Sequence, residues 1–580
     1  MRSTFAGLEL ARRALESQQI ALDTTGHNIS NANTTGYTRQ VVNLQATLPD
    51  SIPGMGHYLS VGTGVTVQSI ERARDIFIDR QFRWENSKHE YWAARENTLA
   101  KIEGLLNEPS DNSLSNDLSQ FWNAWSDLSK NPENLGARSV VLERAATLVD
   151  TFHHIDQQIT ELQKSLDSSV RVQIGQINMY AKQIQELNLQ IKKVQVSGDN
   201  PNDLLDKRDA LVDELSKLVN VRVVESRDPT FTDREVNVFK LYIGNDKTAN
   251  QILVDDTKSY QLETPAAAGA DGEPFAEVKW GAGHPLAGAS VDLGEGSGEL
   301  QASILLRGSG FDYDTANGDT KANAHLAYLR EQYNELARGI AEAVNAIHRT
   351  GINKDNNSGL DFFDTGAEPV TAANIKVNVD LINDPWQIAT GKNTFGDGEI
   401  AKAINSLSSG WTGLTGLALT KTDGKTILID PNTGDETSDP SIGRSVVWAS
   451  ATDTPLLDPD TGDPILIDPA TGDVTTDTAI GKPVVWAPLP PLSASSFGDY
   501  YGAALAELGV DVQQATRMKE GQAVLVTHMY NQRESVVGVN MDEEITNLVK
   551  FQKSYTAAAR IVTMLDSMLD TIVNGMGVTR

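Results

Sequence analysis

The chain has 580 residues and a formal net charge of −29, because 78 Asp and Glu outweigh 49 Lys and Arg. A polyanion of this strength is not expected to bind nucleic acid or an anionic membrane through bulk charge. Cysteine is absent, which excludes disulfides, thiolate metal sites and Cys nucleophiles. We expect neither a membrane span, which needs roughly 18–20 apolar residues in a row, nor a secretory signal peptide, because the start lacks an apolar core.

A heptad repeat marks the start of the chain. Leu8, Leu15, Leu22 and Ile29 recur every seven residues, which is the spacing of a coiled-coil seam or of one face of an amphipathic helix. The Thr-Thr-Gly at residues 24–26 predicts that the helix ends or kinks there, which would leave Ile29 just outside it.

A longer helical block follows. Apolar residues recur at intervals of three and four from residue 141 to 194, and the spacing slips near Val170. One continuous helix and two successive helices both fit this pattern. Residues 202–218 predict a further helix, capped by Asn202 or Asp203.

The middle of the chain changes to a period of two. Residues 236–243 alternate in hydropathy and predict a strand, and glycine and proline punctuate residues 221–298. A helical pattern returns over residues 323–347 and again from residue 499 onwards. The stretch from 351 to 494 is strand- and loop-like.

This second β-like stretch contains an internal duplication. Residues 427–435 read ILIDPNTGD and residues 465–473 read ILIDPATGD, while VVWA occurs at 446–449 and again at 484–487. Both pairs are offset by 38 residues. We predict a duplicated β-hairpin unit, spanning 427–449 and 465–487, because two copies are too few for a solenoid.

The C-terminal region carries a second heptad stripe. Its apolar residues follow a 3-4 spacing over eight positions, which are Leu548, Phe551, Tyr555, Ala558, Val562, Leu565, Leu569 and Ile572. Asp542, Glu543 and Glu544 precede the stripe, where carboxylates suit the positive end of a helix dipole. Apolar stripes usually form a core, but each end is a single helix far from the other in sequence. We therefore predict that the two stripes pair with each other and with further copies in a polymer.

Catalytic motifs are missing or incomplete. The sequence has no HExxH and no GxSxG, and residues 424–426 resemble the end of a P-loop but Leu419 stands where the first glycine belongs. We predict no enzymatic activity and no cofactor.

The sequence evidence for a metal site is equally weak. His153 and His154 are adjacent on a predicted helix and point about 100° apart, so they cannot easily share one metal ion. Repeated Asp-Pro-x-Thr-Gly-Asp turns offer oxygens for calcium, but the same residues are what a tight turn needs. Those oxygens would come from Asp458, Asp460 and Asp463. Residues 355–359 allow the same two interpretations.

Five short stretches resemble a known family. Residues 26–40, GHNISNANTTGYTRQ, resemble the signature near the N-terminus of bacterial flagellar axial proteins, a group of rod, hook and hook-associated proteins. Residues 202–211, NDLLDKRDAL, are similar to a motif of the hook-associated protein 1 family. So are NAIH at 345–348 with GLDFF at 359–363, and GVNMDEE at 538–544. The resemblance does not extend to residues 365–494.

The resemblance implies a structural role at the hook–filament junction of the flagellum. It implies a ring or tube of copies of this chain, in contact with the hook protein and with a filament-side junction protein. It also implies secretion through the flagellar type III export apparatus to an extracellular position, with a cytoplasmic chaperone holding the C-terminal helix before export. An isolated amphipathic end helix is expected to be disordered until it packs against neighbours.

The same resemblance marks a turn motif after the first helix, composed of Asn28, Asn31, Gly36 and Tyr37. Asn and Gly suit tight turning, and Tyr37 is expected to anchor the turn against a helix. A simple intrachain turn and a role in assembly are compatible interpretations.

We predict an α+β multidomain fold in which discontinuous helical coiled-coil domains at the termini enclose β-rich insertions. The expected domains are 1–79 with 536–580, for polymerisation; 80–220 with 300–350 and 495–535, helical; 221–299, β-rich; and 351–494, β-rich with the duplicated hairpin. The alternatives are another axial component, such as a hook or rod protein, or a secreted adhesin or enzyme whose activity lies in residues 365–494.

Overall fold

The computed structural model describes residues 6–571 with internal exceptions. The exceptions are residues 54–57, 107, 109, 111–112, 233–234, 245–249, 269–273, 295, 309–324, 358, 365–369, 410–427, 430–435, 438–443, 449–463, 468–473, 476–481 and 487–495.

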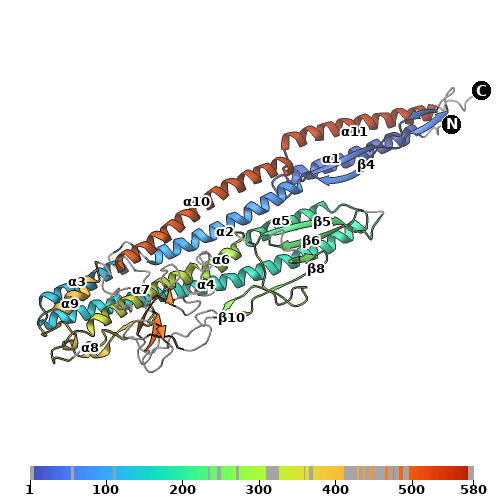
Figure 1. The fold of residues 1–580 in the computed structure, drawn as a ribbon. Helices are drawn as coiled ribbons and strands as arrows, with labels where there is room; N and C mark the ends of the chain where they lie inside the picture. The colour runs from blue at the N-terminus through green and yellow to red at the C-terminus, as the bar shows by residue number, and fades with distance from the viewer. Residues whose placement is uncertain are drawn as a thin grey trace, which may run out of the picture.

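Helices, several of them long, form a shaft that dominates the molecule (Figure 1). They are α2 (Ile76–Leu106), α3 (Leu114–Lys130), α4 (Leu135–Val196), α5 (Asn202–Leu218), α6 (Glu299–Arg307), α7 (His325–His348) and α10 (Phe497–Val537). The antiparallel pair of α2 and α10 runs along one side, and α4 packs against α3, α5 and α6. Since α4 has 62 residues, it is about 90 Å long.

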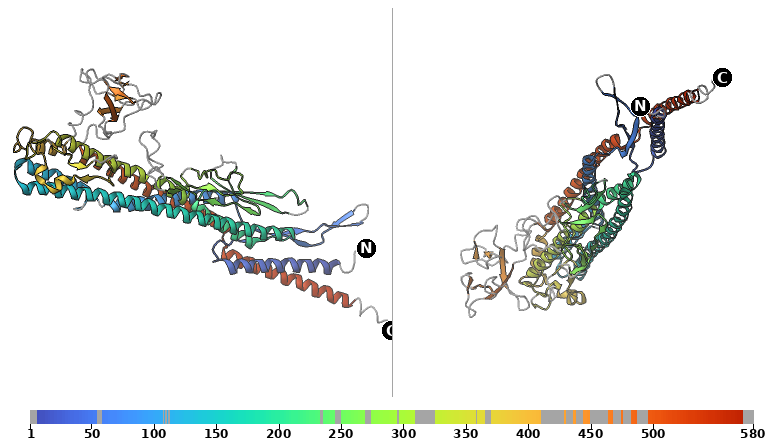
Figure 2. Two further views of the ribbon diagram at one scale, coloured as in Figure 1. Left: turned by 90° about the horizontal axis from the view of Figure 1, so that it is seen from below. Right: turned by 90° about the vertical axis from the view of Figure 1, so that its right-hand side faces the viewer.

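The two ends of the chain leave the shaft together as a terminal pair of helices, α1 (Ala6–Asn31) and α11 (Met541–Asp570). Both termini lie at the same end of the molecule (Figures 1 and 2). A β-ribbon follows α1. It is formed by β1 (Gln40–Ala46) paired with β4 (Val65–Arg72), and by the hairpin of β2 (Asp50–Pro53) with β3 (Tyr58–Val61).

A small β-rich region packs on one face of α4 and α5. Its antiparallel sheet has the order β5-β6-β7-β8, from β5 (Val221–Arg227), β6 (Asn237–Ile243), β7 (Ile252–Asp255) and β8 (Lys258–Ser259). Two-stranded pieces complete it, formed by β9 (Leu262–Glu263) with β12 (Lys279–Trp280) and by β10 (Ala266–Ala268) with β11 (Pro274–Ala276). Side chains of β6 alternate between the core and the surface, so Phe239, Leu241 and Ile243 are buried against Ile177 and Ile184 of α4.

The other end of the shaft is closed by short elements after α7. These are β13 (Phe363–Asp364), β14 (Lys376–Val377), α8 (Val379–Asn383), the 3-10 turn η2 (Pro385–Gln387) and α9 (Glu399–Ser406). Asn345 of the NAIH stretch accepts hydrogen bonds from the backbone of Phe362 and Phe363. Phe362 is thereby fixed against Trp125 of α3, and Phe363 against Phe121 of the same helix, in the core.

The duplicated stretch forms a sheet with the order β16-β15-β17-β20-β18-β19. Its strands are β15 (Leu428–Ile429), β16 (Glu436–Thr437), β17 (Arg444–Trp448), β18 (Leu466–Ile467), β19 (Val474–Thr475) and β20 (Lys482–Trp486). This sheet stands off from the shaft (Figure 2). The architecture confirms the predicted α+β class, with helical terminal elements and β-rich insertions.

The structure decides two predictions about where helices begin, break or end. The long block is one continuous helix, α4, and no break occurs at Val170. The predicted end of the first helix at residues 24–26 is wrong. Thr24 and Thr25 are buried and their hydroxyls donate to the carbonyls of Ile20 and Ala21, so α1 continues to Asn31 and includes Ile29.

The predicted cap of α5 is also wrong. Pro201 occupies the N-cap position without a side-chain hydrogen bond. The side chains of Asn202 and Asp203 instead form hydrogen bonds with Gln40, the first residue of β1. These tertiary contacts replace the capping interaction.

Candidate functional site

The terminal pair brings the two predicted stripes together. α1 and α11 are antiparallel, since Gly7 lies beside Leu565 while Asn28, near the other end of α1, bonds to Glu544. Most stripe residues are only half-buried in this pair; these are Leu8, Leu15, Leu22, Ile29, Leu548, Phe551, Val562, Leu565 and Leu569. Ala558 is buried and Tyr555 is 36% exposed. Ile572 lies outside the described residues.

Several of the buried positions of α1 are occupied by small residues. Ala11 and Ala21 are at most 1% exposed. Ser17 is also buried, and its hydroxyl donates to the carbonyl of Val65 in β4. Short side chains at these positions let the ribbon and α11 approach the backbone of α1 closely.

Two further groups of apolar side chains on α11 are exposed, with exposed fractions between 41% and 53%. Met541, Ile545 and Val549 lie on one face, and Ile561, Met564 and Met568 lie on another, which we call the exposed stripe. Of the described residues of α11, only Glu544 and Ala558 are buried. A helix that is apolar on two sides and buried on neither needs further partners.

The turn motif is organised by Asn28, which is buried at the end of α1. Its Oδ1 accepts from the Tyr37 hydroxyl at 2.7 Å and from the Gln40 backbone at 3.0 Å. Its Nδ2 donates to the Gln40 carbonyl at 2.9 Å and to Glu544 Oε2 at 3.2 Å. One amide therefore joins α1, the ribbon and the start of α11. Burial, together with the carboxylates of α5 and Glu544, raises the pKa of Tyr37, so its hydroxyl remains a donor.

The remaining turn residues are more local. Asn31 Nδ2 donates to the His27 carbonyl one turn back. Gly36 has φ +79°, and a Cβ there would lie 3.5 Å from Ala210 of α5. A positive φ is costly for residues with a Cβ, so glycine allows the turn to pass close to α5.

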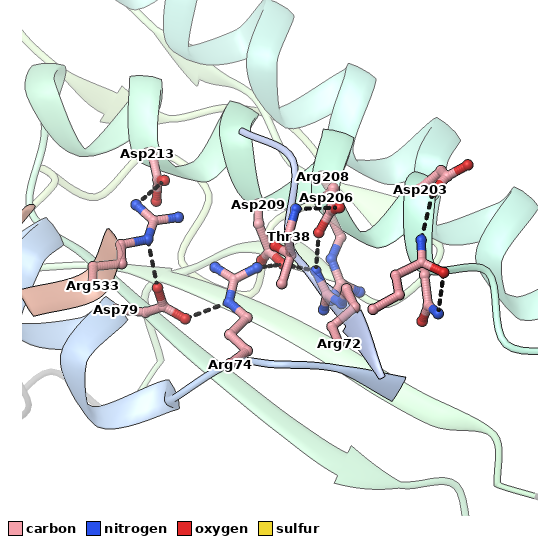
Figure 3. A network of polar contacts seen from close by, with 12 residues as sticks. Thr38, Arg72, Arg74, Asp79, Asp203, Asp206, Arg208, Asp209, Asp213 and Arg533 are labelled. Atoms are coloured by element: carbon pink, nitrogen blue, oxygen red, sulfur yellow. Dashed lines mark hydrogen bonds and ion pairs between the residues drawn. The ribbon is translucent and has the colours of Figure 1, made fainter. Parts of the chain in front are cut away.

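Helix α5 presents the NDLLDKRDAL stretch to this turn (Figure 3). Asp206 accepts from the Thr38 backbone at 3.0 Å and from Arg72 at 2.9 Å. Asp209 accepts from Arg72 at 2.8 Å, from Arg74, and from Arg83 at 3.4 Å. Thus two adjacent turns of α5 hold the end of β4 and the first turns of α2.

The same network reaches α10 (Figure 3). Arg533 pairs with Asp79 of α2 at 3.0 Å and with Asp213 of α5 at 2.7 Å. The ion pairs of this network join four arginines and four aspartates, which are Arg72, Arg74, Arg83, Arg533, Asp79, Asp206, Asp209 and Asp213. Burial favours the neutral form of Asp209, but the guanidinium groups of Arg74, Arg208 and Arg72 overcome it and hold the Asp209 pKa well below its ordinary value.

The C-terminal stretch closes the network. The backbone N–H of Arg39 donates to the Val537 carbonyl at 2.9 Å, and the Arg39 side chain pairs with Glu543 at 3.1 Å. Asn540 caps α11, as its side chain accepts from the backbone of Asp542 and Glu543. We call the region built from residues 28–40, 72–83, 202–213 and 533–544 the joint, because it connects the terminal pair to the shaft.

Other candidate residues have structural roles or lie outside the description. His153 Nε2 is 2.8 Å from the Ile375 carbonyl. Asn353 accepts from the backbone of Asp355 and Asn357, which makes a turn of that stretch. The Asp458 turn and residues 424–426 are outside the described residues. In the part that is described, no three His, Asp or Glu side chains are arranged to hold a metal ion.

The joint was only partly foreseeable. The sequence identifies the family-like stretches 26–40, 202–211 and 538–544, but it does not predict that they contact one another. Asp206, Asp209 and Asp213 are spaced by three and four, which places them on one helical face. That acidic face, and the basic residues after β4, were the available signals.

Comparison with known proteins agrees with this architecture. Residues 8–38 match the flagella basal body rod protein model, and residues 532–575 match the model of the flagellar basal body rod FlgEFG protein C-terminal region. The paired ends thus define a flagellar axial protein. Residues 99–363 match the helical domain of flagellar hook-associated protein FlgK.

Full-length relatives narrow the class. Flagellar hook-associated protein 1 of Bacillus subtilis is 32% identical over 100% of this chain and 99% of its own length. Its counterpart in Escherichia coli is 28% identical over 97% and 98%. The flagellar hook junction protein FlgK of Burkholderia pseudomallei gives a TM-score of 0.48 at 18% identity, covering 79% of this chain and 100% of that one. The chain belongs to the flagellar hook-associated protein 1 family and is a structural component of the bacterial flagellum.

Proposed function

We propose that the chain is a structural subunit that joins the flagellar hook to the filament, and that it acts without catalysis. The observation that carries the proposal is the terminal pair, whose helices come from opposite ends of the chain and leave apolar stripes incompletely covered. A ring or tube of copies would cover them. In this proposal the predicted terminal domain, residues 1–79 with 536–580, mediates assembly. The other predicted domains lie outside the assembled terminal helices.

Polymerisation would proceed through the predicted seams and the exposed stripe of α11. Met564 is 51% exposed and Met568 is 53% exposed in the single chain. Since these side chains are already half-buried, covering each one would contribute about half of the 1.5–3 kcal/mol of a full burial, so assembly would need many such contacts along the helices. None of the helices in the described part of the chain has the length and hydropathy that a membrane crossing requires.

The partners would follow from the position in the flagellum. Copies of this chain would contact the hook protein on one side and a filament-side junction protein on the other. A cytoplasmic chaperone would cover the exposed stripe of α11 before export, because that surface would otherwise associate in the cell. After export the chain would be extracellular.

The test is complementation of a motile host that lacks its own hook-associated protein 1. The full chain should restore filaments, and a chain lacking residues 540–580 should leave bare hooks and release flagellin into the medium. Met564→Glu should behave like the truncation, since it places a charge in the stripe. Thr563→Glu, at an exposed position that points about 100° around the helix from Met564, is the matched control and should retain filaments.

Two results would reject the proposal. If the full chain reaches the medium but never supports filaments, while it does restore hooks in a strain lacking hook protein, it is a different axial component. If the truncated chain supports filaments as well as the full chain does, the terminal pair is not the assembly element.

A further inference from the structure

The sheet of the duplicated stretch has an internal symmetry that the sequence repeat alone does not reveal. In the first unit, Leu428 of β15 pairs with Thr437 of β16 on one side and with Ser445 of β17 on the other. In the second unit, Leu466 of β18 pairs with Thr475 and with Pro483. Every partner is shifted by the same 38 residues, so the two units have the same three-stranded fold in the same register.

The two units meet through equivalent strands. β17 pairs with β20 in the antiparallel sense, and Val447 stands opposite Val485, which is its own counterpart in the repeat. On either side, Val446 stands opposite Trp486 and Trp448 stands opposite Val484. Val446 is therefore opposite the counterpart of Trp448, and Trp448 is opposite the counterpart of Val446. Such a pairing is a local two-fold arrangement. It is the geometry of an isologous interface between two identical molecules.

The outer edges of the sheet differ from this centre. The terminal strands β16 and β19 contribute two paired residues each, and short edge strands discourage further pairing. β17 and β20 are each five residues long. In the second unit Ile465 and Ile467 are buried, so at least one face of the sheet is packed.

We propose that one hairpin unit is self-complementary along its β17 edge, and that the duplication covers within a single chain an edge that a one-unit chain offers to a second copy of itself. The proposal does not depend on the assembly of the terminal helices. Its partner is fixed by the register, because two copies of β17 would place Val447 opposite Val447, with Val446 opposite Trp448 on each side. Unpaired strand edges are ready templates for pairing with another chain.

The test removes one repeat period from the full chain. Deleting residues 450–487 removes 38 residues and joins Ala449 to Pro488, which reproduces the natural Ala487–Pro488 junction. The intact chain and the deletion variant are compared by light scattering after size exclusion at equal concentrations. The deletion variant should have twice the mass of its chain under conditions where the intact chain is monomeric. Adding Val447→Pro, which removes a backbone donor from the middle of β17, should restore the monomer.

Cysteine pairing tests the register, since the chain has no native cysteine. Residues directly opposite in an antiparallel pair have Cα atoms about 4.5–5.5 Å apart, which is within disulfide range. In the deletion variant, Val447→Cys should form a disulfide-linked dimer on oxidation. Thr437→Cys, on the strand at the far edge, should not. In the intact chain, Val447→Cys combined with Val485→Cys should form an internal disulfide without dimers.

Each contrary outcome overturns the proposal. A deletion variant that remains monomeric, and that stays unlinked on oxidation when it carries Val447→Cys, shows that the edge has no affinity for a copy of itself. A dimer that Val447→Pro does not disrupt, or that cross-links with Thr437→Cys but not with Val447→Cys, shows a different interface. Failure of the internal disulfide in the intact chain would reject the two-fold pairing itself.

Discussion

The joint and the terminal pair are neighbours that satisfy their side chains in opposite ways. In the joint, charged groups are buried and paired within the chain; Asp206 and Arg83, for example, are each 6% exposed. In the terminal pair, apolar groups stay half-exposed, and α11 buries only two of its described residues. The ion pairs at the centre of the joint form within one chain, whereas the terminal pair has surface left for other molecules.

The difference also concerns specificity. A buried ion pair repays its desolvation only in good geometry, so a network of this kind adds less to stability than to the definition of one arrangement. Apolar contact is not directional. We infer that the joint fixes the direction in which the terminal pair leaves the shaft, and that the terminal pair supplies the adhesive surface.

The largest effect is expected when the centre of the joint is removed. Asp209→Ala leaves Arg72, Arg74 and Arg83 without a shared buried carboxylate, and removing one partner of a buried pair costs about 3–5 kcal/mol. The free energy of unfolding from urea titration measures this loss. Hydrogen exchange should localise it to residues 72–83 and 202–213.

The control lies on the same helix. Asp203 has a 60% exposed side chain and contacts Gln40 and His27 at the surface. Asp203→Ala should therefore change stability by less than about 1 kcal/mol. Equal effects of the two substitutions would contradict the view that the joint depends on its buried carboxylates.

Lowering the pH should destabilise the core around His348 before it destabilises the joint. Burial lowers the pKa of His348, in the core at the far end of the shaft, to about 4 from an ordinary value of 6.5. The unfolded chain then binds the proton more readily, so this stability is present above pH 6.5 and is lost as the pH falls from there towards 4. The full difference is on the order of 3 kcal/mol.

The joint should respond only at lower pH. The pKa of Asp209 is depressed in the folded state, so its contribution persists down to the ordinary Asp value of about 4 and is lost on further acidification. Hydrogen exchange of residues 340–365 and 202–213 at several pH values should show the far core yielding first. His348→Gln should remove the first step and leave the second. One common transition in the wild-type chain would contradict this order.

The helices that carry both regions could be predicted from sequence because their patterns are local. The heptads that begin at Leu8 and Leu548, and the long block that forms α4, can be recognised from the spacing of apolar residues alone. The misplaced end of α1 shows the limit. Thr24 and Thr25 are poor helix residues by propensity, but in the folded chain they are buried, and their hydroxyls bond to carbonyls one turn back.

The joint could not be assembled from sequence because its partners are remote. Arg72 and Asp206 are separated by 134 positions, and Arg533 and Asp213 by 320. Asp206, Asp209 and Asp213 of α5 indicate an acidic face, but nothing local indicates which of the 49 basic residues meets it. The same holds for Asn28 and Glu544, which lie 516 positions apart.

A smaller effect is expected where the two regions touch. Asn28→Ala removes a side chain that makes hydrogen bonds to Tyr37, Gln40 and Glu544, and leaves the buried Glu544 carboxylate with one partner fewer. Loss of such a buried polar contact costs about 1–3 kcal/mol. Hydrogen exchange should rise at the end of α1 and the start of α11. Asn31→Ala, which removes a bond within its own helix, is the control and should leave the exchange of α11 unchanged.

The smallest effect on the isolated chain is expected from the exposed stripe, and it makes the sharpest contrast with the joint. Met564→Glu replaces a side chain that is already half in water, so the stability of the monomer in urea should change by no more than about 0.5 kcal/mol. Self-association, measured by sedimentation at rising protein concentration, should weaken strongly because the new carboxylate would be buried between copies. Asp209→Ala should show the reverse, with a large loss of stability and the apolar surface of α11 intact. If Met564→Glu unfolds the monomer, or leaves association unchanged, the stripe is part of the single chain's own core and not the surface that it offers to others.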